Sequence, residues 1–150
     1  MLPNFKPSEQ IAVLDTINPV SQAAGSVTTG WVSAQNTHKL LAVVQVGVFG
    51  ASATVDANIQ QAQDNAGTGA KAFAIPKAIT QQLAAGGNNK QVLINVAGSD
   101  FDVENSFYFV RLTITVGTAA SLVSGALFGF ATRNAPGSDL NNASVAQIVG

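Results

Sequence analysis

The sequence predicts an all-β protein: one jelly-roll-like β-sandwich of eight or nine short antiparallel strands, with extended arms at its N- and C-terminal ends. Three observations support this fold class. Apolar residues recur mostly at every second position, Gly, Asn, Pro and Ser separate the apolar segments at nearly regular spacing, and no segment has the period of a long helix. We expect arms at residues 1–22 and 134–150 around a sandwich at residues 23–133, a length that suffices for one core.

Nine segments alternate in the manner of strands and are separated by turn signals. In chain order they are Ile11–Ile17, Val27–Ser33, Leu40–Phe49, Thr54–Gln61, Lys71–Ile75, Ala78–Leu83, Gln91–Ala97, Phe107–Val116 and Leu122–Thr132, of which Ala78–Leu83 is either a short strand or a turn. Asn18-Pro19 is expected to end the first strand and Pro76 the fifth, because proline has no amide hydrogen to donate within a ladder. Gly86-Gly87-Asn88-Asn89 is the strongest hairpin-loop signal. Ser99–Asn105 is expected to form a helical turn capped by Ser99.

Two of these segments indicate what the core contains. The segment 54–61 places Val55, Ala57 and Ile59 on an inward face, with polar residues between them. The segment 40–49 is apolar on both faces. We therefore expect it to be buried from both sides, either within the domain or by a partner.

Charged side chains are few. The chain has 7 basic and 8 acidic residues, a net charge of −1 and no cysteine. It therefore lacks the clustered positive charge that holds nucleic acid, and it cannot form disulfides or thiolate metal sites. No apolar run reaches the roughly 20 residues of a membrane helix, and no signal-peptide pattern is present, so we expect a protein made in a reducing cytosol with no membrane partner. A surface this poor in charge suits burial against neighbouring molecules.

No catalytic constellation is evident, so we expect a protein that is not an enzyme and uses no cofactor or metal. His38 is the only imidazole, and no zinc-protease or nucleophile-elbow motif surrounds it. Gly67-Thr68-Gly69-Ala70-Lys71 lacks the spacing of a phosphate-binding loop and is interpreted as a hairpin loop.

Three carboxylates at alternate positions, Asp100, Asp102 and Glu104, superficially resemble a calcium loop. The glycine and the final glutamate that an EF-hand loop requires are replaced by Asn105 and Arg111. A solvated, capped turn is the favoured interpretation. A hard-cation site completed by residues from elsewhere in the chain is the alternative.

The segment 107–116 is the most informative about binding. One of its alternating faces is aliphatic apart from one tyrosine and is expected in the core, while the other carries two phenylalanines and an arginine, types that are enriched at interface hot spots. The candidate interface residues are Phe107, Phe109 and Arg111 from this segment, with Phe5 and Ile148 from the two arms. Two alternatives remain: a loop of the same chain covers these side chains, or the two faces are reversed.

Six stretches between residues 23 and 132 carry a family resemblance. They are AAGSVTTGWV at 23–32, SATVDA at 52–57, QQA at 60–62, GTGAK at 67–71, YFVRL at 108–112 and TITVGT at 113–118. Together they resemble a family of small β-sandwich virion proteins of tailed bacteriophages. The resemblance implies a head decoration (cement) or minor capsid protein, with no catalytic residues to carry over. Its expected partner is the major capsid protein and its expected place is the head surface, after synthesis in the host cytoplasm.

We expect the chain to associate with itself as well. A β domain that does so is expected to have closed symmetry, and a homotrimer suits the local three-fold positions of an icosahedral lattice. Two other functions remain open. One is a neck, tail or fibre-base component of the virion. The other is a carbohydrate-binding jelly roll. Sugar sites usually need exposed aromatic side chains for stacking, and Trp31 and Tyr108 are the only tryptophan and the only tyrosine in the chain.

Overall fold

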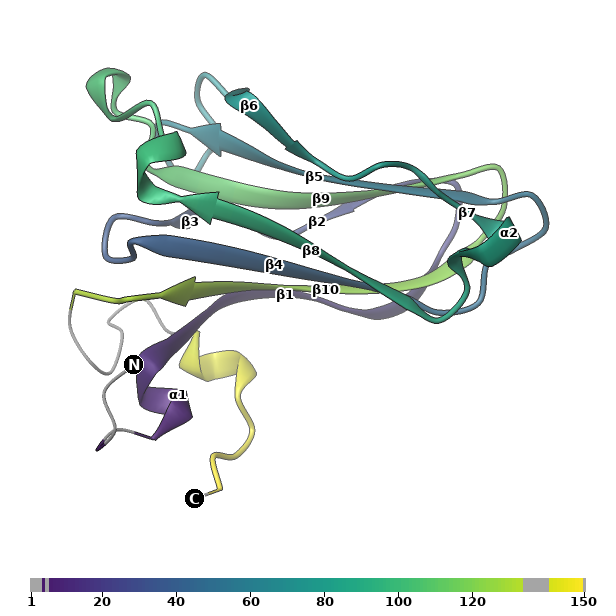
Figure 1. Ribbon diagram of the computed structural model, residues 1–150, viewed down its shortest axis with the longest axis horizontal. Helices are drawn as coiled ribbons and strands as arrows, with labels where there is room; N and C mark the ends of the chain where they lie inside the picture. The colour runs from purple at the N-terminus through teal and green to yellow at the C-terminus, as the bar shows by residue number, and fades with distance from the viewer. Residues whose placement is uncertain (1–3, 5, 134–140, 150) are drawn as a thin grey trace.

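The structure is a computed structural model that describes residues 4, 6–133 and 141–149. Ten strands form two antiparallel sheets that pack face to face (Figure 1). Sheet A has the order β1 (Ile11–Gln22), β10 (Ser121–Phe130), β4 (Lys39–Val46), β8 (Lys90–Ala97). Sheet B has the order β2 (Gly25–Thr28), β9 (Phe109–Gly117), β5 (Thr54–Ala62), β6 (Lys71–Ala78). The two-residue strands β3 (Val32–Ser33) and β7 (Gln82–Leu83) pair with β9 and β5 respectively.

The strand order defines a jelly roll. When the two-residue strands are set aside and the others are numbered along the chain, sheet A has the order 1-8-3-6 and sheet B the order 2-7-4-5. Successive strands therefore cross between the sheets, except β5 and β6, which are neighbours in sheet B, and the first strand of sheet A pairs with the last, as in two interlocked Greek keys. The expected fold class is confirmed, with ten strands in place of eight or nine because two short pairings add to the count.

The core lies between the two sheets, as the alternation predicts. Val55, Ala57 and Ile59 of β5 are each no more than 2% exposed. They meet the inward residues of β4, which are Leu40, Ala42, Val44 and Val46, and those of β9, which are Val110, Leu112, Ile114 and Val116. On the outer face of β4, Leu41 and Val43 are only half-buried.

The expectation that Pro19 and Pro76 end their strands was wrong, and the reason is the same for both. β1 continues through Pro19 to Gln22, and its pairing with β10 shifts register between Ile17 and Val20. β6 continues through Pro76 to Ala78, and its pairing with β5 breaks between Ala72 and Lys77. Each proline lies in a bulge of an edge strand, where its missing N–H costs no ladder hydrogen bond. The segment 1–22, expected as an arm, thus contributes an edge strand to sheet A.

The connections also differ from expectation. The segment 84–87 forms a short helical turn, α2 (Ala84–Gly87), between β7 in sheet B and β8 in sheet A, so the glycine-asparagine signal marks a crossing and not a hairpin. Residues 98–105 form two 3-10 turns, η1 (Gly98–Asp100) and η2 (Val103–Asn105). Ser99 lies within η1 and caps neither turn; instead, a carboxylate oxygen of Asp100 accepts a hydrogen bond from the Ala97 amide at 2.7 Å.

Both described ends of the chain lie beside sheet A. The short helix α1 (Pro7–Gln10) leads into β1, and a C-terminal 3-10 turn, η3 (Asn142–Ser144), lies near β1 and β10 (Figure 1). The Asn141 amide donates to the Val13 carbonyl of β1 at 2.8 Å. Ser144 lines a cavity of about 410 Å³ together with Val43, Ala126 and Phe128. The C-terminal segment therefore reaches part of the apolar outer face of sheet A.

Candidate interaction surfaces

The outer face of sheet B carries two of the expected interface residues. Phe109 and Arg111 point outward from β9 and are half-buried. Arg111 pairs in register with Gln60 of β5, and its Nη2 donates to the Gln60 Oε1 at 3.1 Å. The guanidinium also lies over the ring of Trp31, 4.5 Å from its centroid, in a cation–π contact. Arg111 is therefore held in one orientation by two partners from different parts of the chain.

Trp31 also belongs to this surface, although no pattern in the sequence indicates it. It follows β2, and residue 67 of the β5–β6 connection lies against its indole, so closely that a Cβ at Gly67 would overlap the Trp31 Nε1. Arg111 and Trp31 are far apart in the chain and share no spacing pattern. Only the pairing of β3 with β9 brings them together.

Some buried polar side-chain atoms on this face form no hydrogen bond within the described part of the chain. In the described residues, the buried Asn58 Oδ1, Thr113 Oγ1 and Arg111 Nε have no hydrogen-bond partner. Asn58 and Thr113 are direct cross-strand neighbours, and Arg111 lies next on the same face of β9. Buried polar atoms without partners are uncommon in folded proteins. Their clustering marks the outer face of sheet B as the polar candidate surface.

Phe107 does not belong to this surface. It precedes β9, is only 5% exposed, and has the Lys71 ammonium 3.9 Å above its ring centroid. A Cβ at Gly69 would lie 3.5 Å from its ring. The expectation that Phe107 and Phe109 share an outward face was wrong for Phe107, because the strand begins only at Phe109 and a loop of the same chain covers the earlier ring.

The two arm residues have different outcomes. Phe5 lies outside the described residues. Ile148 is 57% exposed and its neighbour Val149 is 84% exposed. The C-terminal segment thus presents two adjacent aliphatic side chains to solvent, an arrangement that suits a contact with another molecule.

The three alternating carboxylates serve the chain's own packing. Asp102 forms an ion pair with Lys71 and accepts from the Asn105 side chain at 2.8 Å. Asp100 pairs with Lys77 at 2.8 Å. These contacts tie the turns η1 and η2 to β6, and no group of three metal-ligating side chains occurs within the described ranges. The arrangement supports the capped-turn interpretation over a cation site.

Acid is expected to weaken this attachment. Hydrogen bonds from Lys77 and the Ala97 amide lower the pKa of Asp100, and those from Lys71 and Asn105 lower the pKa of Asp102, below the ordinary value of 3.8. As the pH falls, these carboxylates bind protons in the unfolded chain before they do so in the folded protein. The stability that the two ion pairs contribute is therefore fully present above the pKa of the unfolded state, and it is lost as the pH falls through the lower pKa of the folded state. The melting temperature of Asp100→Asn/Asp102→Asn should therefore fall less between pH 5 and pH 3 than that of the wild type.

The matched control for this prediction is Glu104→Gln, which removes an exposed carboxylate from the same turn. It should leave the acid dependence close to that of the wild type. An equal effect of the two variants would show that net charge, and not the two ion pairs, sets the response.

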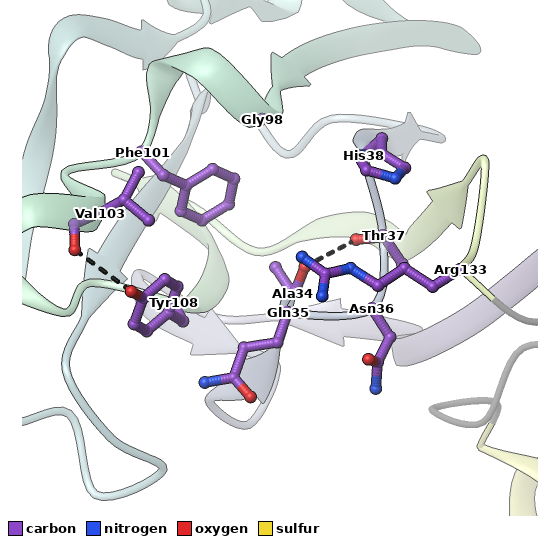
Figure 2. A pocket seen from close by; sticks show the side chains of 10 residues that line it. All are labelled: Ala34, Gln35, Asn36, Thr37, His38, Gly98, Phe101, Val103, Tyr108 and Arg133. Atoms are coloured by element: carbon purple, nitrogen blue, oxygen red, sulfur yellow. Dashed lines mark hydrogen bonds between the residues drawn. The ribbon is translucent and has the colours of Figure 1, made fainter.

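A cleft of about 480 Å³ lies at the end of the sandwich, between the β3–β4 connection and the turns after β8. Figure 2 shows Phe101 and Tyr108 on one side of it, and His38 and Arg133 on the other. The Tyr108 hydroxyl donates to the Val103 carbonyl at 3.2 Å, within the chain. Since Arg111 also occupies one face of Trp31, both rings considered for carbohydrate stacking already make contacts inside the chain.

Comparison with known proteins shows likeness of fold only. No protein-family model and no curated protein matches the chain. Among solved structures, the SPBc2 prophage-derived protein YomS is similar with a TM-score of 0.44 and 10% identity over 79% of this chain and 93% of that one. A capsid chain of Ralstonia phage GP4 has a TM-score of 0.42 and 15% identity over 89% and 90%. A Clostridium thermocellum xylanase, Xyn10B, with CBM22-1 and GH10 modules, has a TM-score of 0.44 and 10% identity over 82% of this chain and 26% of that one.

These likenesses join proteins of unrelated function, so they say nothing of what this chain does. What the chain's own geometry defines is a jelly-roll domain with a polar outer face on sheet B and an exposed aliphatic C-terminal segment. No helix in the part of the chain that the structure describes is long and apolar enough to cross a membrane.

Proposed function

We propose that this chain is a non-enzymatic structural component of a tailed-phage head, a decoration (cement) or minor capsid protein that binds the major capsid protein lattice at the head surface. The observation that carries this proposal is the nature of the exposed surface. Large aliphatic side chains, including Ile148 at 57% and Val149 at 84% exposure, stand on a domain with only 15 charged residues. Such a surface is better suited to burial between protein neighbours than to a free monomer. The sequence resemblance supplies the class of neighbour.

Binding of this kind stabilises a shell through linkage. A protein that binds the assembled lattice and not free subunits adds about 2.7 kcal/mol per site when its free concentration is a hundred times the Kd. In this proposal Phe109, Arg111 and Ile148 contact the lattice or a second copy of the chain. On the shell, a homotrimer is the expected arrangement, since it matches the local three-fold positions of an icosahedral lattice.

The copy number of the chain per purified particle tests the proposal. Quantitative mass spectrometry against the most abundant shell protein should give a near-stoichiometric ratio. Ile148→Asp should lower the affinity for shells that lack the protein at least about tenfold, because a buried charge then replaces an apolar contact. Ile75→Asp is the control, since it changes an isoleucine of β6 that is also exposed, at 71%, and lies outside the proposed contact, so it should bind as the wild type does.

A handful of copies per particle would move the protein to the neck, tail or fibre base, and its absence from particles would overturn the proposal. Binding to a glycan array in place of shells would support the carbohydrate-binding alternative.

A further inference from the structure

The four free edges of the two sheets are not equivalent. An exposed edge strand offers unpaired N–H and C=O groups to any extended chain, and folded proteins usually block this with bulges, prolines, charges, short strands or a covering segment. β1 has two register shifts, Pro19 and the Asn141 contact on its Val13 carbonyl. β6 has Lys71, Lys77, Pro76 and a broken register. β2 and β3 are four and two residues long.

The strand β8 has the fewest of these protections. It is eight residues long, pairs with β4 without a register shift, and contains no proline or glycine. Its single charge is Lys90, at its first position. No strand lies beyond it in the part of the chain that the structure describes, and Leu93 at its centre is 57% exposed.

The hydrogen bonds at the end of β8 show which of its backbone N–H and C=O groups face β4 and which face the open edge. The Gly98 amide donates to the His38 carbonyl, which continues the β4 side, whereas the Ala97 amide donates to the Asp100 side chain. Successive residues of a strand point their N–H groups to opposite sides. The backbone groups of Gln91, Leu93 and Asn95 therefore face the open edge.

We propose that β8 pairs antiparallel with β8 of a second copy of this chain, with Leu93 opposite Leu93 on a two-fold axis. Directly opposite residues of an antiparallel pair lie on the same face of the sheet, so odd-numbered residues must meet odd-numbered ones. Centring on Leu93 brings two exposed leucines together and sets Gln91 opposite Asn95. If the two-fold axis passed through residue 94, Leu93 would lie opposite the side-chain amide of Asn95. That ladder would also need the Ala97 N–H, which already donates to Asp100.

The remaining contacts of this pairing are compatible with it. Lys90 stands opposite Val96, so no like charges face each other across the ladder. On the inner face, half-buried Val92 meets Ile94 of the second copy. Both residues line a groove of about 470 Å³ between β8 and the segment 76–82, which gives the incoming strand room beside the edge. The contact is isologous, as a two-fold interface requires.

A single introduced thiol tests the pairing, because the natural chain has no cysteine. Opposite Cβ atoms in such a ladder are about 4.5–5.5 Å apart. Leu93→Cys should therefore be converted to a covalent dimer by a short thiol-to-thiol cross-linker. Leu83→Cys, at a 51% exposed leucine on β7, is the matched control and should give no covalent dimer on a denaturing gel under the same conditions.

Charge pairing gives a second readout on the folded, unmodified protein. Light scattering across a concentration series should show a dimer for the wild type. Leu93→Lys should weaken it at least about tenfold, as should Leu93→Glu, because like charges then lie directly opposite. Mixing the two variants should restore the dimer, which follows only if residue 93 meets residue 93.

Equal cross-linking at positions 83 and 93, or a wild type that stays monomeric at every concentration, would overturn the β8 pairing. So would mixed Lys and Glu variants that fail to recover. The pairing does not depend on where the protein resides, so these outcomes leave the copy-number test of the proposed function unaffected.

Discussion

Replacing Leu112 by alanine should lower the free energy of unfolding by about 2–5 kcal/mol. Leu112 is fully buried on the inner face of β9, at the centre of sheet B, and its Cδ2 lies close to Gly125 of sheet A. Truncation removes apolar contacts from both sheets and leaves a cavity that two packed β-sheets close only in part. Urea denaturation followed by circular dichroism measures the change.

The control for this prediction is Leu83→Ala, the same substitution at a side chain that is 51% exposed. Folding removes little of the Leu83 surface from water, so its truncation should change the unfolding free energy by about 0.5 kcal/mol or less. A comparable loss at both positions would mean that the space between the sheets is not the main source of stability.

Gly67→Ala is expected to destabilise the protein and to disturb the Trp31–Arg111 contact. Gly67 has a φ of +85°, a conformation that costs a residue with a Cβ about 1–2 kcal/mol, and the added methyl would overlap the Trp31 indole. Displacing the indole adds about 1–3 kcal/mol of packing strain. Since Trp31 is the only tryptophan, its fluorescence emission should shift in the folded variant.

Gly86→Ala separates the two costs. Gly86 has a φ of +100°, and a Cβ there would meet nothing within 4 Å. It should show the backbone cost alone and leave the Trp31 emission unchanged. If Gly67→Ala were no more destabilising than Gly86→Ala, the indole would not be held in place by residue 67.

The fold class could be predicted because alternation is a local property. In β5 and β9 each residue's face follows from its neighbours, and the residues of both strands that were expected inward are buried. Strand partners could not be predicted, since the pairing of β1 with β10 depends on the closure of the whole domain. The signals at Pro19 and Pro76 misled for the same reason: a proline ends a central strand but is tolerated in a bulge at an edge, and the sequence does not say which strands are edges.

The candidate surface was predicted in part. Arg111 was identified from its face of β9, but its contact with Trp31 depends on β3 pairing with β9, which no spacing pattern encodes. Phe107 was misplaced because the alternation was extended past the start of the strand. The open edge of β8 could not be recognised at all before the sheet order was known.

The pairing of β1 with β10 has a consequence for synthesis. Ile11 and its successors find their partners only at residues 121–130, about a hundred residues later in the chain. At about 5–20 residues per second, the ribosome exposes β1 for several seconds before those partners emerge. Sheet A therefore closes only after β10 has emerged, in a step slowed by the entropy of bringing distant segments together. In that interval Pro19, which has no N–H to donate, limits the pairing of β1 with other unfinished copies.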